Sequence, residues 1–309
     1  MNYIVFDLEW NQDMNDEIVN DVKFEIIEIA AIKLNDELEI TGEFKEIIRP
    51  VIYKKLHPII KELTGFKENE LRKGITFPEC ITKFMNWIGT DEYRFCTWAT
   101  QDLYELQKNM NHYGMYLVEK PPLYYYDIQK LFSIMCENGK DRRALKYAVD
   151  LLNIEKKVPF HRAYGDAYYT AMVMKKIEFE KVKSNFSIDI YRIPYNREEE
   201  IYVRFDRYDK FISMGYENRE KLMAQRYLRR MYCNLCDRKI RTKIDWFSDG
   251  MRSFYYLGKC RKHGFVKGKI RIRKNCSNKV FAIKTIKNIG VDEMEEIKQK
   301  KFNKKTSPN

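Results

Sequence analysis

Two acidic residues near the N-terminus stand where they could bind a metal ion. Asp7 and Glu9 follow the apolar run 3–6, which has the composition of a β-strand. Side chains two apart on a strand point to the same face, so both carboxylates would face the same way. A hard divalent cation with oxygen ligands would neutralise such a pair. An acidic loop just past a strand is the alternative interpretation.

Three later residues extend this pattern. Asp102 opens an expected helix after the run 95–98, His161 stands in a loop after Pro159, and Asp166 starts another expected helix. Each residue alone has an ordinary structural explanation, such as a helix cap or a partner of the helix dipole. Together, four carboxylates at strand and helix ends plus one histidine form the set that two-metal chemistry requires.

These residues, in this order, resemble the DEDDh branch of the DnaQ-like 3′–5′ exonucleases, which includes RNase T, oligoribonuclease and the ERI-1-like enzymes. The resemblance spans roughly residues 2–178 and continues between the acidic positions, in the segments Glu-Ile-Ala-Ala at 28–31, Leu-Thr-Gly-Phe at 63–66, Phe-Pro-Glu at 77–79 and Trp-Ala-Thr-Gln-Asp at 98–102. The chain departs from the family pattern at Trp10, where many members have Thr, and at Ala99, where Gly is usual.

The resemblance implies a role for each residue of the acidic set. Asp7 would bridge two Mg²⁺ or Mn²⁺ ions, Glu9 and Asp166 would complete the first, and Asp102 would support the second. His161 would be the general base that takes a proton from the attacking water, because an imidazole can gain and lose a proton near neutral pH. The expected product is a nucleoside 5′-monophosphate, released from the 3′ end one at a time.

The terminal base of a single strand needs an apolar or aromatic surface on which to stack. We expect Leu8, Trp10 and Phe66 to form that surface around the 3′ nucleotide. For Leu8 and Phe66, packing in the protein core is an equally good interpretation.

A second group of metal-binding residue types lies in the C-terminal third. Cys233-Asn-Leu-Cys236 and Cys260-Arg-Lys-His263 supply the four ligands of a closed structural Zn²⁺ site. Between them, the ranges 239–246 and 252–257 predict a β-hairpin, and 268–274 predicts a third strand, a layout that resembles a zinc ribbon. Two alternatives are free thiols and imidazole that are close only in sequence, and Cys276 as the fourth ligand in place of His263.

Basic and aromatic residues alternate along this zinc-ribbon-like segment. They predict a surface that contacts phosphates and stacks bases. The aromatic residues are Trp246, Phe247, Phe254, Tyr255 and Tyr256. The alternative is that these rings form a small core while the cations face water.

The elements that must position the acidic set belong to an α/β fold. Apolar runs at 3–6, 24–34 and 43–48 predict an antiparallel meander, and shorter strands are expected at 95–98 and 124–127. Helical spacing begins at residue 58. Helices are expected from residue 78 and at 102–113, 128–137, 144–152 and 165–180. This order predicts an RNase H-like mixed sheet flanked by helices.

Charge divides the 309 residues into two parts. Residues 184–309 hold 31 Lys/Arg against 15 Asp/Glu, whereas residues 1–183 are mildly acidic. We therefore predict an exonuclease domain at 1–183, a basic connecting segment at 184–230 with a helix at 219–230, a zinc-ribbon-like β domain at 231–290 and a disordered polar tail at 291–309. The basic half favours nucleic acid as the partner, although a solvated surface would look the same.

Further sequence features restrict the location and the function. No run has the roughly 18 apolar residues of a membrane helix, and the N-terminus lacks the pattern of a signal peptide, so we expect a cytoplasmic protein with reduced cysteines. The predicted function is a metal-dependent 3′–5′ exonuclease, acting on RNA more readily than on single-stranded DNA. The alternatives are a nuclease-like regulatory protein that binds without catalysis, and a proofreading subunit of a polymerase.

Overall fold

A computed structural model describes the chain except for residues 16, 20, 118–121, 251, 276–277 and 307–309. It divides into two compact units, Met1–Asp189 and Ile190–Asn309. The division falls close to the predicted boundary at residue 183. Among the described residues, no helix is long and apolar enough to cross a membrane.

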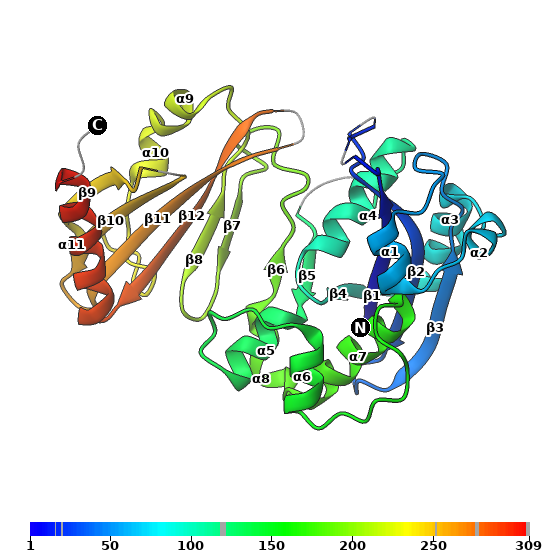
Figure 1. Cartoon of the computed structure of the whole chain (residues 1–309). Helices are drawn as coiled ribbons and strands as arrows, with labels where there is room; N and C mark the ends of the chain where they lie inside the picture. The colour runs from blue at the N-terminus through cyan, green and yellow to red at the C-terminus, as the bar shows by residue number, and fades with distance from the viewer. Residues whose placement is uncertain (16, 20, 118–121, 251, 276–277, 307–309) are drawn as a thin grey trace. The chain divides into compact units, whose positions relative to one another are not determined.

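The first unit is built on a six-stranded mixed sheet in the order β3-β2-β1-β4-β5-β6 (Figure 1). β1, β2 and β3 form the predicted antiparallel meander, β4 and β5 join it in parallel, and β6 closes the other edge in antiparallel orientation. The strands are β1 (Asn2–Gln12), β2 (Phe24–Leu34), β3 (Ile40–Ile47), β4 (Tyr93–Thr97), β5 (Tyr124–Asp127) and β6 (Ser187–Ile188).

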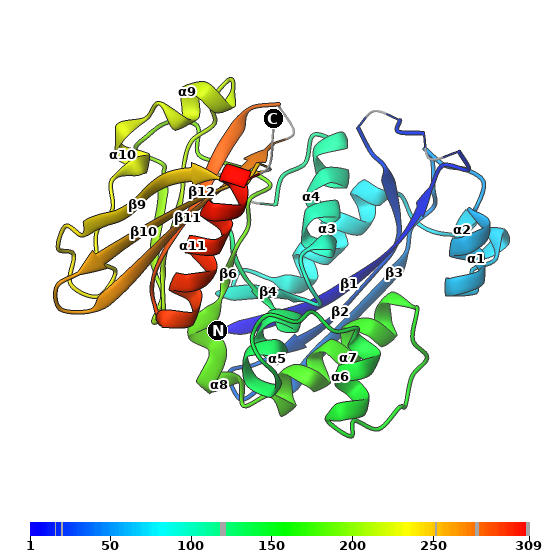
Figure 2. The same ribbon diagram turned by 60° about the vertical axis from the view of Figure 1, so that its left-hand side comes forward.

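Helices cover both faces of this sheet (Figure 2). The odd residues of β1, such as Tyr3 and Val5, pack against α5, α6, α7 and α8, whereas the even residues Ile4 and Phe6 pack against α3 and α4. The helices are α1 (Pro58–Thr64), α2 (Glu68–Arg72), α3 (Phe77–Ile88), α4 (Gln101–His112), α5 (Ile128–Cys136), α6 (Leu145–Leu151), α7 (Ala163–Lys176) and α8 (Phe179–Val182), followed by a 3₁₀ turn at Lys183–Asn185. This architecture confirms the predicted RNase H-like fold class.

The second unit is a six-stranded antiparallel sheet in the order β7-β8-β12-β11-β10-β9. Its strands are β7 (Ile201–Arg204), β8 (Asp209–Ile212), β9 (Arg241–Ser248), β10 (Ser253–Cys260), β11 (Gly264–Lys274) and β12 (Val280–Ile289). The hairpin β9–β10 and strand β11 are the three strands of the predicted zinc-ribbon-like layout. The Cys/His residues sit with them, so the predicted small β domain is confirmed.

Two segments of the second unit differ from the predictions. Residues 184–230 are more than a connecting segment, because β7 and β8 extend the sheet and pair with β12 through β8. The predicted helix at 219–230 is two short helices, α9 (Arg219–Met223) and α10 (Arg226–Arg229).

The predicted disordered tail is also different, since it forms helix α11 (Val291–Thr306). Met294 and Ile297, three residues apart, bury their side chains against Phe247, Tyr255 and Leu257 of the sheet. That apolar contact orders a segment whose lysine-rich composition alone suggests disorder.

Candidate active site and zinc cluster

Three of the predicted carboxylates converge beside the second half of β1, and Asp7 and Glu9 lie within that strand rather than just after it. One ligand oxygen from each of Asp7, Glu9 and Asp166 lies within 4.8 Å of the others, close enough to share a cation. Strand alternation turns Asp7 and Glu9 toward the face that α7 covers, and Asp166 comes from the first turn of that helix. The register of β1 against β2 shifts between Glu9 and Trp10, which places a β-bulge beside the site.

Asp102 lies at the start of α4 and is not one of these three. It is 5% exposed, and its carboxylate accepts hydrogen bonds from the backbone N–H groups of Asp102 and Leu8. Its charge is still near enough to raise the pKa of Asp7. Asp102 is therefore a neighbour of the three-carboxylate cluster rather than a direct member of it.

Burial and mutual repulsion disfavour ionisation of the whole set. Burial is the larger cause at each residue, and the neighbouring carboxylates add to it. The pKa of Glu9 rises to about 8, that of Asp102 to about 7, and those of Asp7 and Asp166 also rise. A cation among these oxygens would remove the repulsion, so the arrangement fits a metal site.

His161 is held on a tight loop beside Asp166. Its backbone has φ +63°, a left-handed conformation, and its N–H donates to Oδ2 of Asp166 at 3.3 Å. Its side chain is exposed rather than packed among the carboxylates. Gly165 lets α7 approach this loop, because a Cβ at that position would lie 1.9 Å from the carbonyl oxygen of Pro159. The close packing of α7 at Gly165 therefore fixes the position of the loop that carries His161.

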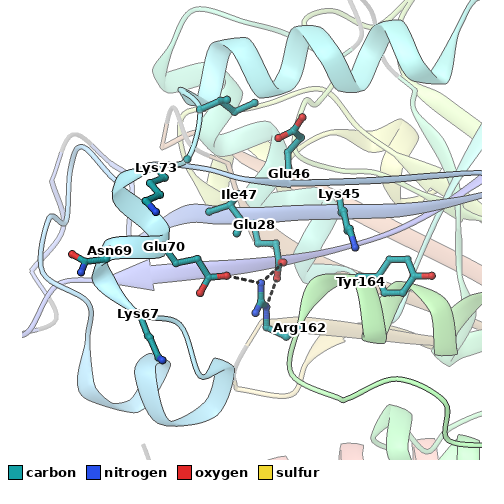
Figure 3. A pocket seen from close by; sticks show the side chains of 12 residues that line it. Glu28, Lys45, Glu46, Ile47, Lys67, Asn69, Glu70, Lys73, Arg162 and Tyr164 are labelled. Carbon is teal, nitrogen blue, oxygen red and sulfur yellow. Dashed lines mark hydrogen bonds and ion pairs between the residues drawn. The ribbon is translucent and has the colours of Figure 1, made fainter.

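An ion pair that joins β2 to α7 was not assigned from the sequence. Arg162 donates through Nε and Nη2 to both oxygens of Glu28, at 3.1 and 2.9 Å (Figure 3). Glu28 also accepts from the N–H of Ala163 at 3.0 Å. Glu28 is 4% exposed and lies opposite Glu9 in the sheet. It thus ties the first turn of α7, which carries Asp166, to the strand beside the cluster.

A pocket of about 790 Å³ opens next to this ion pair (Figure 3). β2, β3, α2 and the start of α7 form its walls. Lysines at 45, 67 and 73 line it together with Arg162 and with carboxylates at 28, 46 and 70. Both positive and negative side chains therefore line this hollow, and one of them, Glu28, lies opposite Glu9 in the sheet.

The three predicted base-contacting residues have different environments. Phe66 is fully buried beside Ile27 and Leu71, and the guanidinium of Arg162 stacks on its ring at 4.1 Å. Leu8 is 3% exposed and packs in the core below α3 and α4. Burial of these two side chains contradicts a base-stacking role and agrees with the alternative of core packing. Trp10 remains partly exposed, with its ring 5.5 Å from that of Phe24.

The C-terminal cluster brings Cys233, Cys236, Cys260 and His263 together, with their ligand atoms within 4.8 Å of one another. The Sγ atoms of Cys236 and Cys260 are 3.7 Å apart, and Nδ1 of His263 is 3.4 Å from Cys233 Sγ and 3.9 Å from Cys260 Sγ. Ligands held at zinc–sulfur and zinc–nitrogen bond lengths around a tetrahedron would be about 3.5–3.8 Å apart. Cys276, the alternative fourth ligand, lies outside the described residues.

Comparison with known proteins places the first unit in a family. The model of the RNase T exonuclease family matches residues 4–174, more than half of the chain. The chain belongs to this exonuclease family. The match confirms the resemblance to DEDDh 3′–5′ exonucleases. It covers all four predicted carboxylates and His161.

Curated relatives of this exonuclease domain are distant. The human 3′–5′ exoribonuclease 1 is 25% identical over 169 residues, covering 53% of this chain and 40% of that protein. A PolC-type DNA polymerase III from Clostridium perfringens is 29% identical over 195 residues, covering 60% of this chain and 12% of that protein. The exonuclease domain thus spans less than half the length of these relatives.

Solved structures share its fold. The nuclease domain of 3′hExo, a DEDDh family member bound to rAMP, aligns with a TM-score of 0.52 at 20% identity, covering 61% of this chain and 96% of that one. Cell-death related nuclease 4 aligns with a TM-score of 0.51 at 16% identity, covering 66% and 68% of the two chains.

One departure from the family pattern has a visible backbone consequence in this chain. Ala99 stands where the resemblance leads us to expect Gly, and its φ is +80°. A Cβ makes that left-handed conformation costly, whereas glycine adopts it freely. The Oγ1 of Thr97 donates to the carbonyl of Ala99 at 2.5 Å, which helps to hold the turn that leads to Asp102.

Proposed function

We propose that this protein is a metal-dependent 3′–5′ exonuclease that releases nucleoside 5′-monophosphates, with RNA as the preferred substrate over single-stranded DNA. The observation that carries the proposal is the convergence of Asp7, Glu9 and Asp166 in a chain of the exonuclease family. Three partly buried carboxylates with raised pKa values have little reason to face one another unless a cation binds there.

Asp7, Glu9 and Asp166 would hold one Mg²⁺ or Mn²⁺ ion, and Asp102 would support a second on the side of α4. Bound divalent ions supply charge stabilisation for the phosphate under attack and for the departing 3′ oxygen. His161 would accept a proton from the attacking water. Its exposed ring on a loop tied to Asp166 suits a base that must meet solvent and phosphate together.

Two features support RNA as the substrate. One curated relative is a 3′–5′ exoribonuclease, and one structural neighbour was solved with rAMP bound. Trp10 is the remaining candidate for stacking on the terminal base, because its ring is partly exposed beside the site. The PolC-type relative makes DNA the comparison that the assay must include.

We also propose that the second unit binds one structural Zn²⁺ through Cys233, Cys236, Cys260 and His263. Their separations match a tetrahedral site, and burial otherwise raises the pKa of the Cys233 thiol to about 11. Metal analysis of the purified chain should find about one zinc, and a Cys236→Ser variant should lose it. We expect a cytosolic location, where such thiolates stay reduced.

The decisive experiment follows 5′-labelled and 3′-labelled RNA and DNA oligonucleotides with Mg²⁺, with Mn²⁺ and without either ion. Hydrolysis should shorten the strands from the 3′ end and should require the ion. It should disappear in Asp7→Ala, and the rate of hydrolysis by His161→Ala should be about 100-fold or more below that of the wild type. Asp91→Ala, which removes an exposed aspartate of the same unit, is the matched control and should keep full activity.

The outcome that would overturn the catalytic assignment is equal hydrolysis by wild type, Asp7→Ala and His161→Ala. Metal-independent binding of the oligonucleotides without any hydrolysis would favour the alternative of a nuclease-like protein that only binds.

A further inference from the structure

The second unit carries a hollow whose wall charges are all positive. Its volume is about 640 Å³, and it lies where the two cysteine-containing turns meet the ends of β9 and β10. Four of its cations come from one segment, Arg238, Lys239, Arg241 and Lys243. Three come from the other, Lys259, Arg261 and Lys262. Ile240 and Cys260 complete the lining, so the described wall contains seven cations and no carboxylate.

The nearest acidic residues in sequence do not neutralise these cations. Asp237 pairs with Arg204 at 2.5 Å, and Asp245 pairs with Arg229 at 3.3 Å. Both partners lie outside the hollow. Among the ion pairs of the described residues, none involves a cation of the hollow. All seven side chains are exposed, and their mutual repulsion would be relieved by an anion.

The Cys/His cluster fixes the two segments that supply the cations. Cys236 lies two residues before the first segment, Cys260 lies inside the second, and His263 directly follows it. The N–H of Cys233 donates to the carbonyl of Arg238 at 3.0 Å, and Asn288 of β12 donates to the carbonyl of His263 at 2.8 Å. The shape of the hollow therefore depends on the four ligands staying together.

The chemistry of the wall selects phosphate rather than bases. The aromatic residues expected to stack bases are largely in the core, with Phe247, Tyr255 and Tyr256 at 4–6% exposure. None of those aromatic residues is among the described residues that line the hollow. A cationic wall with no ring in its described lining binds a polyanion by releasing counterions, independently of base sequence.

We propose that this hollow binds several consecutive phosphates of a single-stranded nucleic acid, and that the Cys/His cluster must hold its metal for the binding to occur. The choice of nucleic acid over other polyanions rests on the proposed exonuclease function. The hollow would then give the enzyme a second hold on its substrate, on a part of the strand outside the active site.

The test measures binding of a 20-nucleotide fluorescein-labelled RNA and of oligo(dT) by anisotropy, over a range of KCl concentrations. Full-length Asp7→Ala serves as the background, so that nothing is cleaved. The first variant removes three cations of the hollow, Lys239→Gln, Arg241→Gln and Arg261→Gln. The matched control removes three exposed cations from the opposite end of the same sheet, Arg252→Gln, Arg271→Gln and Lys274→Gln.

Losing three phosphate contacts should lower the slope of log K against log salt by about 2 and weaken binding about 100-fold near 0.1 M salt. The control should weaken binding less than about threefold. RNA and oligo(dT) should lose affinity equally. Equal losses in the two triple variants, or unchanged binding in the hollow variant, would overturn the proposal.

Three further measurements separate the explanations. Cys236→Ser should lose zinc and affinity together, and retained affinity without zinc would refute the metal dependence. If poly-glutamate displaces the labelled RNA as well as unlabelled RNA of equal charge does, the ligand of the hollow would be an acidic polypeptide rather than a nucleic acid. With Asp7 intact, the hollow variant should hydrolyse a dinucleotide at the wild-type rate, because so short a substrate does not need the second hold. If neither the wild type nor the hollow variant hydrolyses the dinucleotide, that result would instead refute the exonuclease function.

Discussion

Arg162→Ala tests how the first unit holds its candidate metal site. The variant removes the cation that donates two hydrogen bonds to Glu28, whose side chain is only 5% exposed (Figure 3). It leaves a buried carboxylate close to Glu9, whose pKa Glu28 already raises. The change therefore places an unpaired buried charge next to a cluster that is already crowded with carboxylates.

The size of the effect follows from the burial of the pair. Breaking a buried ion pair by removing one partner costs about 3–5 kcal/mol. The Arg162 side chain is itself 30% exposed, so water can partly replace it and the lower end, about 3 kcal/mol, applies. For a unit of this size, the melting temperature should fall by about 6–12 °C. Since Glu28 also accepts from Ala163 at the start of α7, the Mg²⁺ concentration for half-maximal activity should rise about tenfold.

Differential scanning calorimetry and Mg²⁺ titrations of activity measure both effects, and two variants serve as controls. Lys83→Ala breaks an exposed pair with Glu46 and should cost less than about 1 kcal/mol. Glu28→Gln combined with Arg162→Ala removes the buried charge and should be more stable than Arg162→Ala alone. The reasoning fails if Arg162→Ala is as mild as Lys83→Ala, or if the double variant is the less stable of the two.

Three further predictions concern the same unit. Ala99→Gly should stabilise it by about 1 kcal/mol, because φ at this position is +80°. Ala167→Gly, inside α7, should destabilise it by about as much. Denaturant unfolding in which both variants shift the free energy of unfolding in the same direction would contradict this. Gly165→Ala should lower the free energy of unfolding by about 1–3 kcal/mol and reduce activity by displacing the loop before His161, while Gly290→Ala, a control in the second unit where a Cβ meets open space, should change neither. In Mg²⁺-free buffer, the melting temperature should rise when the pH falls from about 8 to about 6. Glu9, with a folded pKa of about 8 against an ordinary 4.5, binds its proton in the folded state over this range and loses it on unfolding. Glu9→Gln should flatten that dependence, and Mg²⁺ should stabilise the wild type more at the higher pH.

The parts predicted from the sequence are those in which local spacing has a direct geometric meaning. Alternation along β1 places Asp7 and Glu9 on one face, and the turns of the two cysteine motifs bring four zinc-ligand types together. The pairing of Glu28 with Arg162 could not be predicted in this way, because 133 residues separate them and only the packing of α7 on β2 joins them. The Glu-Ile-Ala-Ala segment at 28–31 resembles a family motif, but the sequence does not reveal which residue pairs with its glutamate.

Burial was the other property that local patterns left open. Phe66 follows a turn, and its sequence position is compatible both with stacking on a base and with packing in the protein core. Its packing with Ile27 and Leu71 decides for the core. In the tail, Met294 and Ile297 have the three-residue spacing of a helix face among many charges. Their contact with the sheet was not apparent from composition, because it depends on a surface made by β9 and β10.

The position of β12 determines where the second unit can be cut. β12 lies between β8 and β11, and it shares the register Ile283–Ile212 to Ile286–Asp209 with β8. A fragment that begins at residue 231 would leave the N–H and C=O groups along this side of β12 without partners, and an uncovered strand of that kind recruits other chains. The minimal fragment for study by itself therefore starts before β7, near Ile190, and includes α11 through Thr306.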